Sequence, residues 1–163
     1  MDLKELLTGF LADAGMDETP VFEDGACHLL IEDRDIGFME TDDGSRLVVW
    51  SAVSSCPVER RDAFLMLLLR ANFMGRMLPN GAFSLSDDDV VYAHCSFTLP
   101  VYDKEDFYRG LKDLLEAVEE WERLAELYKQ VVVANPEGPD SEGAPLAGGG
   151  LGDWALGGPG LRV

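Results

Sequence analysis

Residues 57–74 read PVERRDAFLMLLLRANFM, with an uninterrupted apolar run from Phe64 to Leu69. We predict a helix over about 59–74, opened by Pro57. On a helix these side chains cover nearly the whole circumference, so the helix must be buried on two sides. In a domain of this size, a second copy of the chain most easily covers the other side. We therefore predict a homodimer whose interface contains Phe64, Leu65, Leu68, Leu69 and Asn72.

The sequence before this segment combines one helical pattern with several short apolar runs. Residues 3–14 place leucine, phenylalanine and alanine at helical spacing, which predicts an amphipathic helix that ends near Gly15. Beyond it, turns rich in aspartate and glycine separate the apolar runs, as in antiparallel strands joined by hairpins. The second of these strands is either one bent strand or two. We predict three strands, near 21–23, 26–32 plus 36–40, and 46–53.

Two more strands and a long helix follow the central segment. The strands fit residues 82–85 and 90–98, with an aspartate-rich turn between them. A helix from about Asp103 to Val131 carries apolar residues at alternating spacings of four and three, a stripe that can lie across a sheet. The order α-β-β-β-α-β-β-α predicts an α+β fold in which an antiparallel sheet packs against helices.

Composition divides the chain into a domain over residues 1–132 and a C-terminal tail over 133–163. The tail holds more than half of the glycines and half of the prolines, which is not typical of a second domain. Its apolar residues leave two interpretations, a flexible segment or one that docks onto the domain or a partner. These residues are Leu151, Trp154, Leu156 and Leu161.

The charge of the chain restricts its partners. Among 163 residues, 31 are acidic and 13 are basic, which gives a net charge of −18. This charge disfavours nucleic-acid phosphates and anionic membranes, and it favours a cationic or polar polypeptide. Three cysteines without a CxxC spacing are typical of reduced thiols. Because the sequence also has neither a signal-peptide pattern nor about 18 consecutive apolar residues, we expect a cytoplasmic protein without membrane insertion.

The sequence lacks the motifs of common catalytic sites. It contains no strand-to-helix phosphate loop, no GxSxG elbow and no HExxH helix, so we expect neither an enzyme nor a bound cofactor. A metal-binding protein is a minor alternative, based on Cys27-His28 and His94-Cys95. Because adjacent strand residues point to opposite faces, each dipeptide offers one ligand to a given face. We therefore favour buried cysteines and half-exposed histidines.

Several short strings follow the order of the predicted elements. They are Phe22-Glu23-Asp24-Gly25 leading into Leu29-Leu30-Ile31-Glu32-Asp33, then Leu47-Val48-Val49, Leu67-Leu68-Leu69-Arg70-Ala71-Asn72, Gly81-Ala82-Phe83-Ser84-Leu85, Thr98-Leu99-Pro100, and Trp121 in the last helix. Together they resemble the class I type III secretion chaperones of the Tir chaperone (CesT) family between about Leu3 and Tyr128. The segment Met77-Leu78-Pro79-Asn80 and the long tail depart from the family pattern.

The resemblance implies a homodimer in the cytoplasm of a Gram-negative bacterium. It also implies a function, which is to bind a segment near the N-terminus of a secreted effector in extended, partly unfolded form. The chaperone would keep that segment competent for secretion and hand it to the secretion ATPase without using ATP itself. An alternative role is regulatory, in which the same fold sequesters a transcriptional antiactivator.

Elementary physics gives this implied function a mechanism. An extended segment can add as a strand to an exposed sheet edge, while its alternate side chains enter apolar pockets. The first helix and the first strands supply candidates for the pocket walls, although each candidate also fits core packing. The predicted effector-binding residues are Leu6, Leu7, Phe10, Leu29, Ile31 and Phe38.

Overall fold

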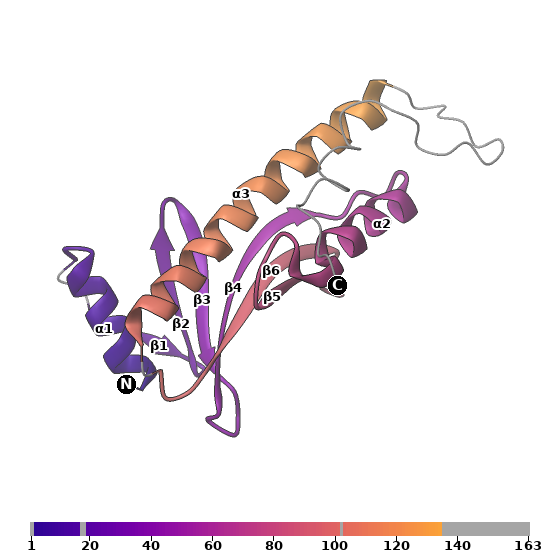
Figure 1. Ribbon diagram of the computed structural model, residues 1–163. Coiled ribbons are helices and arrows are strands. Elements are labelled where there is room, and N and C mark those ends of the chain that lie inside the picture. Colours follow the sequence, from indigo (N-terminus) through magenta and orange to yellow (C-terminus); the bar gives the residue numbers. More distant parts are fainter. Residues whose placement is uncertain (1, 17–18, 102, 135–163) are drawn as a thin grey trace, which may run out of the picture.

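The computed structural model describes residues 2–16, 19–101 and 103–134, and Figure 1 shows the path of the chain. The predicted tail lies outside the described residues, apart from two residues that end the last helix. Docking of the tail through Leu151, Trp154, Leu156 and Leu161 therefore stays a prediction.

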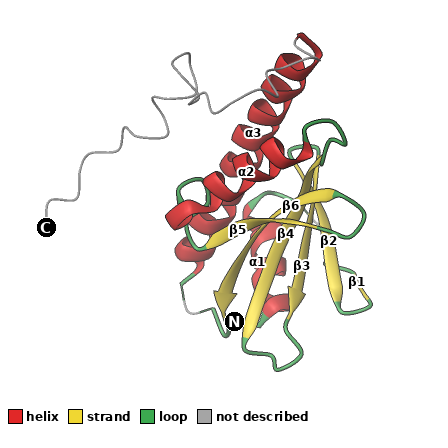
Figure 2. Cartoon of the chain, turned by 90° about the vertical axis from the view of Figure 1, so that its right-hand side faces the viewer, coloured by secondary structure: helices red, strands yellow, loops and turns green. Residues whose placement is uncertain are grey.

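Six antiparallel strands form one sheet in the described part of the chain, in the spatial order β1-β2-β3-β4-β6-β5. Figure 2 shows β1 and β5 at opposite edges of this sheet. The α+β architecture with an antiparallel sheet is therefore confirmed. The strands are β1 (Phe22–Glu23), β2 (Ala26–Ile31), β3 (Arg34–Glu40), β4 (Arg46–Ser55), β5 (Gly81–Leu85) and β6 (Val90–Thr98).

The stretch that the sequence left open between one bent strand and two is two strands, β2 and β3. Glu32 and Asp33 join them with φ angles of 50° and 63°, the pair of left-handed residues that a type I′ hairpin turn requires. Asp24 and Gly25 form the same kind of turn between β1 and β2, with φ angles of 50° and 82°. Within the described residues four strands thus precede the second helix, one more than the predicted order counted.

Three α-helices and one 3₁₀ turn accompany the sheet in the described ranges. Figure 1 shows the longest helix, α3, crossing the sheet from α1 toward α2. None of these helices has the length and apolar character that crossing a bilayer requires. The elements are α1 (Leu3–Asp13), α2 (Arg61–Asn72), the 3₁₀ turn η1 (Phe73–Gly75) and α3 (Lys104–Ala134).

Helix boundaries follow from local backbone chemistry. Asp2 caps α1, because its carboxylate accepts the Glu5 N–H at 2.8 Å and the Glu5 carboxylate accepts the Asp2 N–H at 3.2 Å. Helix α2 is shorter than the predicted 59–74, since Arg60 takes a left-handed φ angle of 52° before its first residue and Phe73 has an extended backbone, with a ψ angle of 113°, after its last. These two residues set the length of the helix that carries the apolar run.

The core lies between the helices and one face of the sheet. Cys27, Phe38, Val49 and Cys95 form a row across four neighbouring strands, and all four side chains are buried. Because side chains alternate along a strand, this row fixes which residues of each strand face the helices.

Trp121 of α3 joins the sheet to α2. Its ring lies 5.0 Å from the ring of Phe83 on β5 and 5.6 Å from that of Phe64 on α2, measured between centroids. The indole N–H of Trp121 donates to the hydroxyl of Ser54 at 3.0 Å. The buried indole is therefore satisfied, as a tryptophan in a core requires.

Candidate functional site

Helix α2 has one side in the core and one apolar side exposed to solvent. Met66, Leu69 and Phe73 follow one another at spacings of three and four, and we call them the α2 stripe. Leu69 is 65% exposed and Phe73 is 62% exposed. A continuous apolar stripe on a surface is typical of a contact with another chain.

The structure places the predicted dimer residues in different environments. Phe64 and Leu68 are buried in the chain's own core, whereas Leu69 is exposed and Leu65 is half-buried. Asn72 is engaged within the chain, where its side-chain oxygen accepts the Phe83 N–H at 2.7 Å. Its amide also donates to the Phe83 carbonyl at 2.8 Å. Leu69 is thus the predicted residue that is most available to a partner.

Sequence reasoning missed three exposed residues at this surface, Met66, Phe73 and Met74. A helical wheel carries the signal for two of them, because Met66 and Phe73 lie on the same line as Leu69. The exposure of Met74 has no such signal in the sequence. It results from the left-handed φ angle of this residue in the 3₁₀ turn that follows α2.

A second surface lies at the open edge of the sheet. Strand β1 covers only the start of β2, where Glu23 pairs with Ala26 and Phe22 pairs with Cys27. Among the described residues no strand pairs with residues 28–31 of β2 on this side. This part of β2 therefore presents an edge to solvent.

The hairpin geometry shows which backbone groups point outward at this edge. In a two-residue hairpin the residues that flank the turn, here Ile31 and Arg34, hydrogen-bond to each other. Antiparallel bonding alternates along the strand, so the N–H and C=O groups of His28 and Leu30 point away from β3. Leu30 is also 68% exposed at its side chain. Both residues can pair with an added strand.

The predicted effector-binding residues divide into two groups by their burial. Phe10, Leu29 and Ile31 are half-buried at the margin of the core. The other three are fully buried, which is the core-packing role that the sequence left open for them. Contact between a partner and these three side chains would require the core to open. They are Leu6, Leu7 and Phe38.

Helix α1 holds Phe10 in place through contacts with the start of α3. The Phe10 ring packs edge-on against Phe107 and Tyr108, with centroids 6.3 and 5.7 Å away. The Tyr108 hydroxyl donates to the Asp13 carboxylate at 2.6 Å, and Lys104 lies 3.3 Å from the same oxygen. Burial, and then this hydrogen bond, raises the pKa of Tyr108 to about 12. Both hydrogen bonds lower the pKa of Asp13, so the link stays formed at neutral pH.

The two thiols of the metal alternative do not approach each other. Cys27 and Cys95 lie at the ends of the buried row that crosses four strands. Three strand spacings separate them by about 14 Å, whereas thiolates that share a zinc ion lie about 4 Å apart. Burial, and secondarily the charge of Asp113, raises the pKa of Cys95 to about 12, so this thiol stays protonated.

The two histidines lie on the other face of the sheet. His28 and His94 belong to the neighbouring row, which alternation directs away from the helices. The His28 ring nitrogen Nδ1 lies 3.0 Å from the Asp35 carboxylate. In the described part of the chain, no group of three or more histidine, cysteine, aspartate or glutamate side chains could hold a metal ion. The arrangement therefore does not support the metal-binding alternative.

Comparison with solved structures finds a similar fold in several protein complexes. The chain is similar to one in the ExsC–ExsE complex, with a TM-score of 0.63 and 22% identity over 76% of this chain and 96% of that chain. It is similar to one in the HopA1–SchA chaperone–effector complex, with a TM-score of 0.59 and 19% identity over 74% and 92% of the two chains.

A third similar structure is the heterodimeric ExoU–SpcU complex from the type III secretion system of Pseudomonas aeruginosa. Its TM-score is 0.59, with 15% identity over 75% of this chain and 96% of that chain. At these identities the likeness is one of fold. Among curated protein sequences, none matches the chain significantly.

Comparison with family models gives stronger evidence than the likeness of fold, because it matches the sequence itself. The model of the Tir chaperone protein (CesT) family matches residues 5–122, which is most of the chain. The matched region includes the edge of β2, helix α2 and Trp121. This chain therefore belongs to the Tir chaperone protein (CesT) family.

Proposed function

We propose that this protein is a type III secretion chaperone that holds a segment of a secreted effector in extended, partly unfolded form. The observation that carries the proposal is the family match over residues 5–122. The fold shared with a chaperone–effector complex and with a complex of the type III secretion system supports it. The chaperone acts through binding, in the cytoplasm of a Gram-negative bacterium, and passes its client to the secretion ATPase.

The edge of β2 is the proposed site for the client backbone. An extended segment can add beside β2 and bond to the outward N–H and C=O groups of His28 and Leu30. The other edge strand, β5, is less accessible, because the Asn72 side chain already bonds to both backbone groups of Phe83. The difference between the two edges favours β2.

Phe10, Leu29 and Ile31 are the proposed walls for the client's apolar side chains. They are half-buried, so a client can cover the part that remains exposed without opening the core. Each apolar side chain that a client buries here gains about 25 cal/mol per Å² of apolar surface removed from water. The net charge of −18 adds long-range attraction for basic client segments.

The α2 stripe is the proposed dimer interface. Two copies that pack Met66, Leu69 and Phe73 against each other would remove this surface from water. A dimer would also present two β2 edges to one client, so that a long segment could wrap around both protomers.

Strand addition can be tested at Leu30. Leu30→Pro removes the outward N–H, while the bonds of β2 to β3 stay in place because they come from the alternate residues. We expect Leu30→Pro to weaken binding of a co-expressed secreted protein at least about fivefold, the effect of one lost hydrogen bond. Isothermal calorimetry with a peptide from the effector's N-terminal region measures the change.

Leu30→Thr is the matched control, because it removes the same apolar side chain and keeps the N–H group. Equal weakening by both variants would show that binding depends on the apolar side chain of Leu30 and not on strand addition. Failure of any secreted protein encoded near this one to co-purify with it would contradict the chaperone proposal itself. The regulatory alternative stays a prediction, and competition between an effector and an antiactivator for the same protein tests it.

A further inference from the structure

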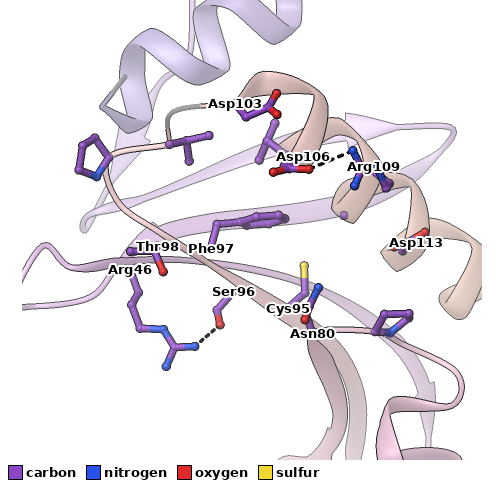
Figure 3. Close-up of a pocket in the computed structure, with 15 residues that line it drawn as sticks. Arg46, Asn80, Cys95, Ser96, Phe97, Thr98, Asp103, Asp106, Arg109 and Asp113 are labelled. Atoms are coloured by element: carbon purple, nitrogen blue, oxygen red, sulfur yellow. Dashed lines mark hydrogen bonds and ion pairs between the residues drawn. The ribbon is translucent and has the colours of Figure 1, made fainter.

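A groove of about 600 Å³ lies between the end of β6, the loop before β5 and the first turns of α3. Figure 3 shows Asp106, Arg109 and Asp113 of α3 on one side of it, with Asn80 and Thr98 from the other elements. It lies at the β5 and β6 end of the sheet, across the sheet from the β2 edge. The groove is thus separate from the proposed client surface.

The floor of the groove contains a stretch of β6 without a neighbour on one side. Strand β5 begins at Gly81, which pairs with Cys95, so in the described ranges no strand lies beside residues 96–98 on that side. The Leu99 N–H donates to the Ser45 carbonyl on the β4 side at 2.9 Å. Because bonding directions alternate, the N–H and C=O groups of Ser96 and Thr98 point into the groove.

Helix α3 approaches this stretch closely enough to form a wall. A Cβ atom at Gly110 would lie 2.6 Å from the ring of Phe97, so glycine allows the helix and the strand to come together here. Side chains of an added strand would alternate between the two faces of the sheet. Every second one would therefore point toward α3, as Phe97 does.

The wall that these side chains would meet carries three aspartates and one arginine at the start of α3, while Arg46 of β4 lines the groove on the face of the sheet away from α3. Asp106 is paired with Arg109 at 2.9 Å, and the Asp103 carboxylate accepts the Glu105 N–H at 2.9 Å. Asp113 lines the groove and takes part in no ion pair or hydrogen bond among the described residues. Past Pro79 a smaller cavity of about 320 Å³, lined by Arg76 as well as by Glu116 and Glu120, continues the groove along α3.

We propose that this groove binds an extended segment of a partner polypeptide that carries arginine or lysine at alternate positions. The segment adds as a short strand beside Ser96 and Thr98, and its basic side chains face Asp113 and the carboxylates that follow along α3. Charge complementarity selects this occupant, because an unpaired carboxylate lies above an open strand edge in a protein of net charge −18. The proposal does not depend on the β2 edge or on the dimer.

The probe is a fluorescein-labelled peptide of seven residues that alternates arginine and threonine, and the measurement is fluorescence anisotropy at low ionic strength. We expect it to bind the full-length protein, and the same peptide with glutamate in place of arginine to show no binding. Asp113→Asn should weaken binding about fivefold, as expected for a partly exposed ion pair. Asp88→Asn, in the exposed turn before β6, changes the net charge equally and should leave the affinity unchanged.

Two N-methylated peptides test strand addition directly, one methylated at every arginine and the other at every threonine. Since alternate N–H groups point to opposite sides of a strand, one of the two should lose binding and the other should keep it. Equal binding by both would overturn the proposal, and so would equal weakening by Asp113→Asn and Asp88→Asn.

Three further results would also overturn it. Absence of binding by the arginine peptide would show that the groove does not bind a basic extended segment. Loss of binding in Leu30→Pro would place the peptide at the β2 edge. A change of oligomeric state in Asp113→Asn, measured by light scattering, would show that a second copy of this chain fills the groove.

Discussion

Gly81 begins β5 at a point where three parts of the chain meet. A Cβ atom at this position would lie 2.4 Å from the backbone carbonyl oxygen of His94 and 2.6 Å from the Leu78 side chain. The carbonyl belongs to the paired strand β6 and cannot move without shifting the sheet. Glycine is therefore required here by the space available, not by its φ angle.

We expect Gly81→Ala to lower the free energy of unfolding by about 2 kcal/mol, because the added methyl overpacks a fixed backbone contact. Urea unfolding followed by circular dichroism measures this change at a fixed protein concentration. Gly9→Ala is the control, since α1 has open space at that position. Alanine should stabilise the helix there by up to about 1 kcal/mol. Similar losses at the two sites would contradict the close contact at Gly81.

At the scale of elements, Asn72 joins α2 to the edge strand β5. Its side-chain amide makes one bond to the N–H and one to the C=O of Phe83, at 2.7 and 2.8 Å. This is the pattern that a neighbouring strand would make. The end of α2 therefore covers an edge that would otherwise be open to pairing with other chains.

Asn72→Ala should lower the free energy of unfolding by about 2 kcal/mol, because it leaves two backbone groups of Phe83 without partners. Asn72→Asp keeps the acceptor and loses the donor, so we expect a smaller loss of about 1 kcal/mol. Analytical ultracentrifugation should show an unchanged oligomeric state for both variants. Dissociation at normal protomer stability would instead place Asn72 in the interface, as the sequence had predicted.

Elements were more predictable from the sequence than the environments of their residues. Periodicity and turn residues located the helices and strands, because both signals are local. The apolar run on α2 could not show which side faces the chain's own core, since that depends on Trp121, far away in the sequence. For the same reason Leu6 and Phe10 looked equivalent on α1, although one is buried and the other is at the margin. Burial depends on the packing of α3, which no local pattern contains.

At the scale of the whole molecule, apolar exposure and charge are unevenly distributed. Helix α2 exposes the α2 stripe at one side of the sheet, while the β2 edge with its exposed Leu30 lies at the other. The net charge of −18 opposes nonspecific association through these apolar surfaces, because whole molecules of like charge repel each other. Specific partners must therefore match shape as well as apolar character.

The proposed dimer is best tested at Leu69, because its side chain is exposed in the protomer. A charge at Leu68 would not distinguish loss of the dimer from unfolding of the protomer. Leu68 is only 6% exposed, so the charge would enter the protomer's own core. Leu69→Asp places one uncompensated charge from each copy in the interface, and the two charges would also repel each other. We expect the dimer to weaken about a hundredfold or more, and size-exclusion chromatography with light scattering at micromolar protein should show a monomer.

Val21→Asp is the matched control for this variant, because Val21 is 68% exposed and directly precedes β1, the edge strand opposite to β5, which Asn72 joins to α2. It makes the same change from an exposed apolar residue to aspartate and should leave a dimer intact. If the Leu69→Asp monomer is too unstable to study, Leu69→Ala gives a milder test, in which the dissociation constant should rise about tenfold through lost apolar burial. A dimer of unchanged affinity in Leu69→Asp would exclude the α2 stripe as the interface, and the exposed leucine and phenylalanine would then have to serve a different partner.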